Sequence, residues 1–263
     1  MVYEALGNCK PMEKKRIEAG LRKLRSALYP RPWPYEWDND KGWLDNAIEE
    51  HKKNRRFCAI IAQDNPRGFA DVICEDDLYE ETEPRWKAER QRRIERTATE
   101  MAACAEMLLR NAKDILFVDP RFKPAELRFQ RSLQAFLQII AARPPGIPAR
   151  RIEIHTGHDE TAGTKAFLDT ECRRHLLPII PHGIQQIELM RWDQKYLHNR
   201  FVLTEYGGLM FAIGLDDHYG SALTHDIVTL LEPEPYAKTW QEYQRDSSTF
   251  TFIDSLIIEG IPA

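Results

Sequence analysis

Three residues in the C-terminal half of the chain combine an imidazole, a guanidinium and a carboxylate at short spacing. In the stretch LHNRFVLTEYGG, His198 and Arg200 are two positions apart, and Glu205 follows five positions later. An imidazole can act as a nucleophile or a proton carrier, and a guanidinium binds phosphate oxygens in a bidentate manner. His198, Arg200 and Glu205 are therefore candidate site residues.

Other polar residues near predicted strand ends have structural explanations beside functional ones. Asp119 follows an apolar run, where open α/β sheets place ligands, but we favour an Asp-Pro turn that ends the strand. His155 lies inside an apolar strand pattern, so we expect a core or edge histidine rather than a second catalytic one. His225 and Asp226 are adjacent, and a strand would direct them to opposite faces.

These residues fall in a region where predicted strands and helices alternate. Apolar runs predict strands, and amphipathic patterns predict helices. The predicted strands cover residues 112–119, 150–157, 185–192, 197–204, 209–216 and 226–233, and the predicted helices cover 124–142, 161–177 and 235–247. The strands at 197–204 and 209–216 are expected to pair across the turn EYGG. Strands separated by helices need crossover connections, so we predict an α/β fold with a mixed sheet covered by helices.

The stretch LHNRFVLTEYGGLMFAIGLD (197–216), in this order of elements, resembles one half of a phospholipase D-like enzyme. Members of that superfamily carry His-x-Lys, four residues and then Asp (the HKD motif), followed by a strand with Gly-Ser and often Asn. His198 matches the histidine, Arg200 stands at the lysine position and Glu205 at the aspartate position. Gly214 is displaced by two positions from the family's glycine, and the serine and asparagine are absent. The segments AKDILFVDPRF and VTLLEPEPYAKTWQEYQ extend the resemblance over about residues 97–263.

The resemblance implies a role for each matched residue. His198 would attack phosphorus, and a second motif histidine from another subunit would protonate the leaving group. Arg200 would hold the phosphate, beside Gly214, and Glu205 would orient a histidine. Because the arginine head is larger than that of lysine, the phosphate can be displaced, and a shift of about 1 Å costs about 100-fold in rate. The missing serine and asparagine remove hydrogen-bond donors to the phosphoryl group.

A second branch of the superfamily is closer to this chain. The phospholipase D-like C-terminal domain of microtubule-interacting-and-trafficking proteins also shows Leu-His-x-Arg and a return strand ending in Gly-Leu-Asp, similar to LHNR and IGLD here. The resemblance to that branch implies a non-catalytic fold that binds acidic phospholipid headgroups or protein partners. Our leading expectation is a degenerate module that binds phosphate groups of a nucleic acid, a nucleotide or a lipid headgroup, without a metal or another cofactor. The alternatives are an active, homodimeric, metal-independent phosphodiesterase or nuclease with His198 as nucleophile, and a protein-interaction module.

The composition of the chain limits which classes of protein it can belong to. Hydrophobic residues make up 43% of the 263 residues, which is enough for a packed core. The net charge of −4 excludes a strongly basic nucleic-acid binder, so a polyanion would have to meet a local patch. The five scattered cysteines show no zinc spacing and predict reduced thiols. We see neither a secretory signal nor an apolar run of about 18 residues, and expect a cytoplasmic protein without a transmembrane segment.

Residues 1–84 are expected to form an N-terminal α+β extension, and residues 85–263 the phospholipase D-like domain with its leading helix. We predict helices over 11–29 and 42–53, and an antiparallel hairpin over 56–63 and 69–75. A long helix is predicted over 85–111. The basic residues of its first half are expected on a solvated face, although they could also follow a nucleic-acid backbone or a membrane surface; they are Arg85, Lys87, Arg90, Arg92, Arg93 and Arg96. The aromatic side chains near residue 35 are expected in a small core, or alternatively in a partner-binding patch; they are Trp33, Tyr35, Trp37 and Trp43.

Overall fold

The computed structural model describes residues 37–54, 57, 59–74, 77, 89–143, 149–158, 163–219 and 221–260, with eight isolated residues between 10 and 22. The chain divides into two compact units, Met1–Arg31 and Pro32–Ala263. In the first unit, the described residues from 11 to 22 are helical, as the sequence predicts at those positions. The expected domain boundary at residue 84 falls outside the described residues and stays a prediction.

The helix α3 (Trp43–Asn54) and the strands β1 (Ile60–Ala62) and β2 (Val72–Cys74) share a small core of Ile48, Ile60 and Val72. The predicted antiparallel hairpin is wrong, because β1 and β2 pair in parallel, with Ile60 opposite Val72. The expected turn does form, with Gly68 N–H donating to Asn65 O at 3.0 Å. However, the connection then carries the chain back to the start of β1 before β2 begins.

The aromatic core expected near residue 35 is wrong for the two tryptophans that the structure describes. Trp37 is 44% exposed and Trp43 is 52% exposed. Trp33 and Tyr35 lie outside the described residues. Trp43 is the first residue of α3, so its side chain has no preceding turn of the helix to pack on.

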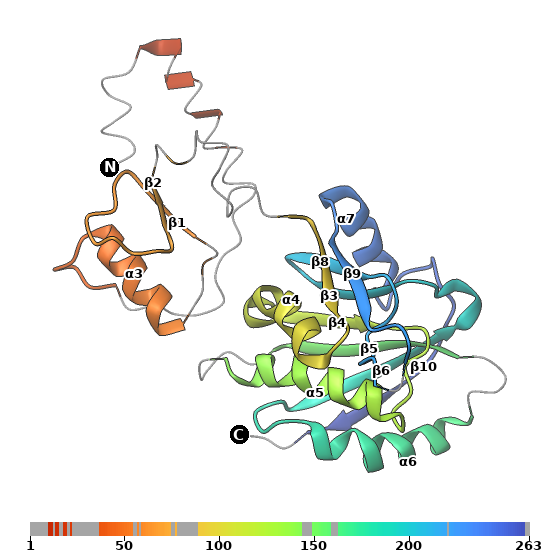
Figure 1. The fold of residues 1–263 in the computed structure, drawn as a ribbon. Helices are drawn as coiled ribbons and strands as arrows, with labels where there is room; N and C mark the ends of the chain where they lie inside the picture. Colours follow the sequence, from red (N-terminus) through yellow and green to blue (C-terminus); the bar gives the residue numbers. More distant parts are fainter. Residues whose placement is uncertain are drawn as a thin grey trace. The chain divides into compact units, whose positions relative to one another are not determined.

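An eight-stranded mixed sheet with the order β10-β6-β5-β4-β7-β8-β9-β3 forms the main body (Figure 1). Its strands are β3 (Gln91–Glu95), β4 (Asp114–Val118), β5 (Arg151–His158), β6 (Gln186–Asp193), β7 (Arg200–Thr204), β8 (Gly207–Phe211), β9 (His225–Leu230) and β10 (Phe252–Glu259). β4, β5 and β6 are parallel, and every other neighbouring pair is antiparallel. The predicted α/β class with a mixed sheet is therefore confirmed.

Helices cover both faces of this sheet (Figure 1). They are α4 (Ala98–Asn111), α5 (Leu127–Ala141), α6 (Lys165–His175) and α7 (Pro233–Glu242), with short 3₁₀ turns η2 (Leu177–Ile179) and η3 (Gln194–Tyr196). The helices α4, α5 and α6 pack on one face, in a core that includes Phe117 and Phe136. On the other face, Trp192 of β6 packs in a cluster with Tyr243, the residue that follows α7, and with Trp240 of that helix. We call these the α5 face and the α7 face.

The long helix predicted over 85–111 is wrong in its first half. Residues 91–95 form β3, in which only Ile94 is buried. The helix α4 begins after the N-cap Thr97, whose side chain accepts a hydrogen bond from Glu100 N–H. Pairing of β3 with β9 at the sheet edge overrides the helical propensity of this basic stretch. No helix among the described residues is long and apolar enough to cross a membrane.

Candidate functional site

One edge of the sheet gathers most of the predicted site residues. The carboxyl ends of the parallel strands β4, β5 and β6 lie along it. The start of β7 and the end of β8 meet there too, since Arg200 lies opposite Phe211. Three loops follow this edge, at residues 119–126, 194–199 and 212–224, and we call it the carboxyl edge. Ligands of open α/β sheets bind at this position.

Arg200 offers an unused hydrogen-bond donor at the carboxyl edge. Its Nη1 donates to the carbonyl oxygen of His198 at 2.9 Å. Its Nε is buried and has no hydrogen-bond partner among the described residues. A buried N–H of a cation without an acceptor is costly, and an anion oxygen is the acceptor that a guanidinium binds best. His198 itself is exposed beside it.

Asp119 connects two loops of this edge. Its Oδ2 accepts from Leu215 N–H at 2.8 Å and its Oδ1 from Arg121 N–H at 2.9 Å. Burial raises the pKa of Asp119, although these N–H groups and the charge of Arg200 act in the opposite direction. The favoured sequence interpretation, a turn that ends the strand, agrees with the hydrogen bond from Phe122 N–H to Asp119 O at 3.1 Å. The side chain adds a second role, which is to fix the loop 212–224 beside Arg200.

Gly214 lies in that loop, against two carboxylates. A Cβ atom at this position would collide with the carboxylate of Asp216 and would come within 3.5 Å of Asp119 Oδ2. The close approach therefore requires glycine. The structure thus brings His198, Arg200 and Gly214 to the same edge of the sheet.

Glu205 does not join them. Its carboxylate accepts hydrogen bonds from Lys113 N–H at 2.6 Å and from Asp114 N–H at 3.0 Å, at the start of β4. Glu205 follows the last residue of β7, and Arg200 is the first, so the strand separates them by about 16 Å. The predicted role of orienting His198 within one chain does not fit this geometry. Glu205 instead fixes the opposite end of β7 to β4.

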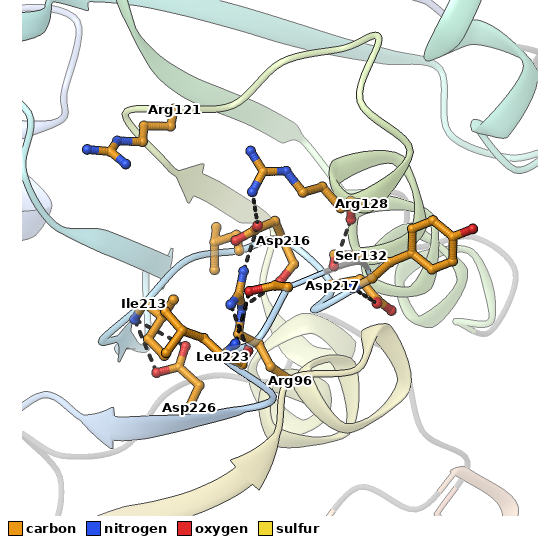
Figure 2. Close-up of polar contacts among 12 residues, drawn as sticks. Arg96, Arg121, Arg128, Ser132, Ile213, Asp216, Asp217, Leu223 and Asp226 are labelled. Carbon is orange, nitrogen blue, oxygen red and sulfur yellow. Dashed lines mark hydrogen bonds and ion pairs between the residues drawn. The ribbon is translucent and has the colours of Figure 1, made fainter.

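A buried network of opposite charges supports the loop 212–224 (Figure 2). Arg96, which is 3% exposed, forms an ion pair with Asp216 at 2.6 Å and donates to the carbonyl oxygens of Asp216 and Leu223 at 3.0 Å. Arg128 contacts the same Asp216 carboxylate at 2.8 Å. The expected solvated position of Arg96 is therefore wrong. The end of β3 turns this side chain inward, where Asp216 compensates its charge.

Two further arginines at this edge were missed in the sequence. Arg121 is exposed, and its guanidinium makes no contact with the other residues drawn in Figure 2. The side chain of Arg128 is 39% exposed on the first turn of α5. The available signal was the DPRF stretch directly after the strand at 112–119, since a residue after a carboxyl strand end reaches the ligand edge. Together with Arg200, these residues form a local group of cations.

The remaining histidine candidates agree with their structural interpretations. His155 is fully buried and stacks on Trp192 at 5.7 Å between ring centroids, so it is a core histidine. His225 is exposed, whereas Asp226 is buried and accepts from Ile213 N–H at 3.1 Å, so the two point apart. Within the described ranges, no group of three or more His, Cys, Asp or Glu side chains could hold a metal ion.

Comparisons with known proteins add little to this geometry. No family model and no curated protein matches the sequence. Among solved structures, the chain shows a likeness to TrmBL2, described as an archaeal chromatin protein with a novel mode of DNA binding, at 11% identity and a TM-score of 0.32. The match covers 91% of this chain and 66% of that protein's chain. A likeness at this level carries no argument about fold or function.

Proposed function

We propose that this chain is a degenerate phospholipase D-like module that binds a phosphate group of a nucleic acid, a nucleotide or a lipid headgroup at the carboxyl edge. The observation that carries the proposal is the Nε of the Arg200 guanidinium, which is buried and has no acceptor among the residues that the structure describes. A phosphate oxygen would satisfy this donor, and the exposed imidazole of His198 would bind a second oxygen.

The charges around Arg200 suit an anion better than the net charge of −4 suggests. Arg121 adds an exposed cation at the same edge, whereas Arg128 is shared between Glu126 at 2.6 Å and Asp216 at 2.8 Å. The acids that accompany them are already engaged, because Asp216 pairs with Arg96 and Arg128 and Asp119 accepts two backbone N–H groups. Burial raises the pKa of Asp119, and the two N–H groups and the charge of Arg200 oppose that shift. Arg121 and Arg200 are thus the side chains that offer positive charge to an anion at this edge.

Binding without turnover is the form of the proposal that fits the residues best. Covalent catalysis in the resembled family needs an aligned phosphate and a second motif histidine, and this chain holds one copy of the motif. The lysine, serine and asparagine of the family are absent, and Glu205 lies at the far end of β7.

Titration calorimetry with inorganic pyrophosphate tests this proposal. We expect Arg200→Ala to weaken binding by about 10-fold or more, since a hydrogen bond to a charged group contributes about 1.5–3 kcal/mol. Arg200→Lys should retain part of the affinity, because it keeps the charge and loses the bidentate geometry. Arg174→Ala is the matched control, since Arg174 is exposed near the C-terminal end of α6. Equal affinity in wild type and Arg200→Ala would refute the site.

Hydrolysis of bis-p-nitrophenyl phosphate in the presence of EDTA separates binding from catalysis. We expect no turnover by the wild type. A metal-independent rate that disappears in His198→Ala would instead establish the phosphodiesterase alternative, with Arg200 as a working substitute for lysine.

A further inference from the structure

We infer that the ligand of the carboxyl edge is a single-stranded nucleic acid, whose bases stack on Tyr196 and Tyr219 while its backbone lies on Arg200. This inference rests on the proposed phosphate site and selects among its possible ligands. Two exposed tyrosine rings, each held by a cation from the protein, flank the arginines.

Tyr219 lies in the loop 212–224, on the side of α5. It is 60% exposed, and the guanidinium Cζ of Arg131 lies 4.3 Å from its ring centroid. Asp217, two residues earlier, fixes this part of the loop to α5 by donating its N–H to Arg128 O at 3.1 Å. The ring is thus tethered to the helix that carries Arg128, and most of its surface remains in solvent.

Tyr196 lies in η3, on the side of α7. It is 39% exposed, and the Nζ of Lys195 lies 4.7 Å from its ring centroid. Phe250, which packs against the core of the α7 face, stacks on it at 6.2 Å with an interplanar angle of 28°. This ring therefore also has a fixed orientation and a partly free surface.

Tyr196 stacks on Phe250 at the α7 face and Tyr219 contacts Arg131 of α5, so the two rings lie on opposite sides of the carboxyl edge that carries the proposed phosphate site. The loop 194–199, which carries Tyr196, leads from the end of β6 to the start of β7. It crosses the carboxyl ends of β5 and β4, a span of three strand spacings or about 14 Å. A ligand that contacts both rings would cross the carboxyl edge, on which His198 and Arg200 lie. An extended polymer with regular phosphates meets this condition, and a compact headgroup does not.

The chemistry of the rings favours nucleic acid over lipid. Every base has a planar π face, and stacking on an aromatic side chain combined with cationic contacts to the backbone is how single strands are held without sequence readout. A duplex hides its base faces, so it would use the arginines alone. A lipid headgroup presents no planar face to a tyrosine.

Fluorescence anisotropy with a labelled oligothymidylate tests the inference on the full chain. We expect Tyr196→Ala and Tyr219→Ala each to weaken binding about 5- to 100-fold, the range that loss of one stacked base produces. Tyr196→Phe and Tyr219→Phe should bind like the wild type, because they keep the ring. Duplex DNA of the same sequence and vesicles containing phosphatidylserine should bind more weakly than the single strand.

The variants separate failure of this inference from failure of the phosphate site. If Arg200→Ala weakens oligothymidylate and pyrophosphate binding while both Tyr→Ala variants bind normally, the phosphate site stands and the stacking inference is wrong. Tighter binding to vesicles than to the single strand also overturns it. If Arg200→Ala has no effect on either probe, both proposals fail. Thermal unfolding of each Tyr→Ala variant, compared with the Tyr→Phe variant at the same position, shows whether a loss of binding reflects a loss of folding.

Discussion

The protonation state of His155 follows from its hydrogen bonds. Trp192 Nε1–H donates to His155 Nδ1 at 2.9 Å, and His155 Nε2 lies 3.0 Å from Glu153 Oε2. An indole is only a donor, so Nδ1 must be an acceptor and the ring must be neutral, with its proton on Nε2. Burial lowers the pKa of His155, and the Glu153 contact opposes this only in part. For Glu153, burial acts to raise the pKa, but the hydrogen bond from His155 and nearby positive charges lower it overall.

This neutral histidine makes the stability of the fold depend on pH. In the unfolded chain, a histidine has a pKa of about 6.5. Below that value the unfolded state binds a proton that the folded state does not, so the free energy of unfolding falls as the pH falls. We expect a loss of up to about 1.4 kcal/mol for each pH unit below about 6.5, until the lowered folded pKa is reached.

Urea unfolding at about pH 7.5 and about pH 5.5, followed by circular dichroism, measures this dependence. His155→Gln should be less stable at both values but should lose this part of the pH dependence. His225→Gln is the control, since His225 is exposed and outside the core. An unchanged pH dependence in His155→Gln would show that another group is responsible.

At the scale of elements, the Arg96–Asp216 pair holds the end of β3 to the loop that follows β8. Both side chains are at most 6% exposed. Removing one member of a buried ion pair leaves an uncompensated charge, which costs about 3–5 kcal/mol. We therefore expect Asp216→Ala to lower the free energy of unfolding by that amount.

Chemical unfolding of Asp216→Ala and Arg128→Ala provides the comparison. Arg128 contacts the same carboxylate from a side chain that is 39% exposed. Its loss should cost about 0–1 kcal/mol, as for a surface pair. Equal costs for the two variants would show that Asp216 is not stabilised by burial with Arg96.

Elements with a strong apolar signal could be predicted from the sequence, and edge elements could not. β4 (DILFV) is buried along its whole length, and its hydrophobic run identified it. β3 (QRRIE) buries only Ile94, so nothing in its pattern distinguishes it from a basic helix. β10 (Phe252–Glu259) was missed altogether. Its exposed face and the bulge between Phe252 and Asp254 break the alternation that marks a strand.

The candidate site could be predicted from the sequence only in part. His198 and Arg200 were found because they are two positions apart at a strand start. The position of Glu205 depended on strand length, since a strand of five residues carries it to the opposite edge. The strand end before Arg121 was a signal that this residue reaches the ligand edge, whereas Arg128 reaches the site through the tertiary position of α5.

At the scale of the whole molecule, binding and catalysis make different demands on the chain. The phosphate site proposed around Arg200 is complete in one chain, whereas covalent catalysis by the resembled mechanism needs a second motif histidine from another chain. We therefore expect one pyrophosphate to bind per chain, with the same affinity in dilute and concentrated protein. Because the net charge is −4, attraction comes from the local arginines alone, and added salt should weaken it.

Titration calorimetry at two protein concentrations measures the number of pyrophosphate molecules bound per chain and their affinity. Sedimentation velocity on the same samples measures the fraction of dimer. Arg121→Ala should reduce the dependence on salt without abolishing binding, because an exposed arginine contributes charge but no buried donor. An affinity that rises with the fraction of dimer would mean that the site is shared between two chains. In that case two copies of His198 would have to lie at one ligand, and the homodimeric phosphodiesterase would become the better account of this edge of the sheet.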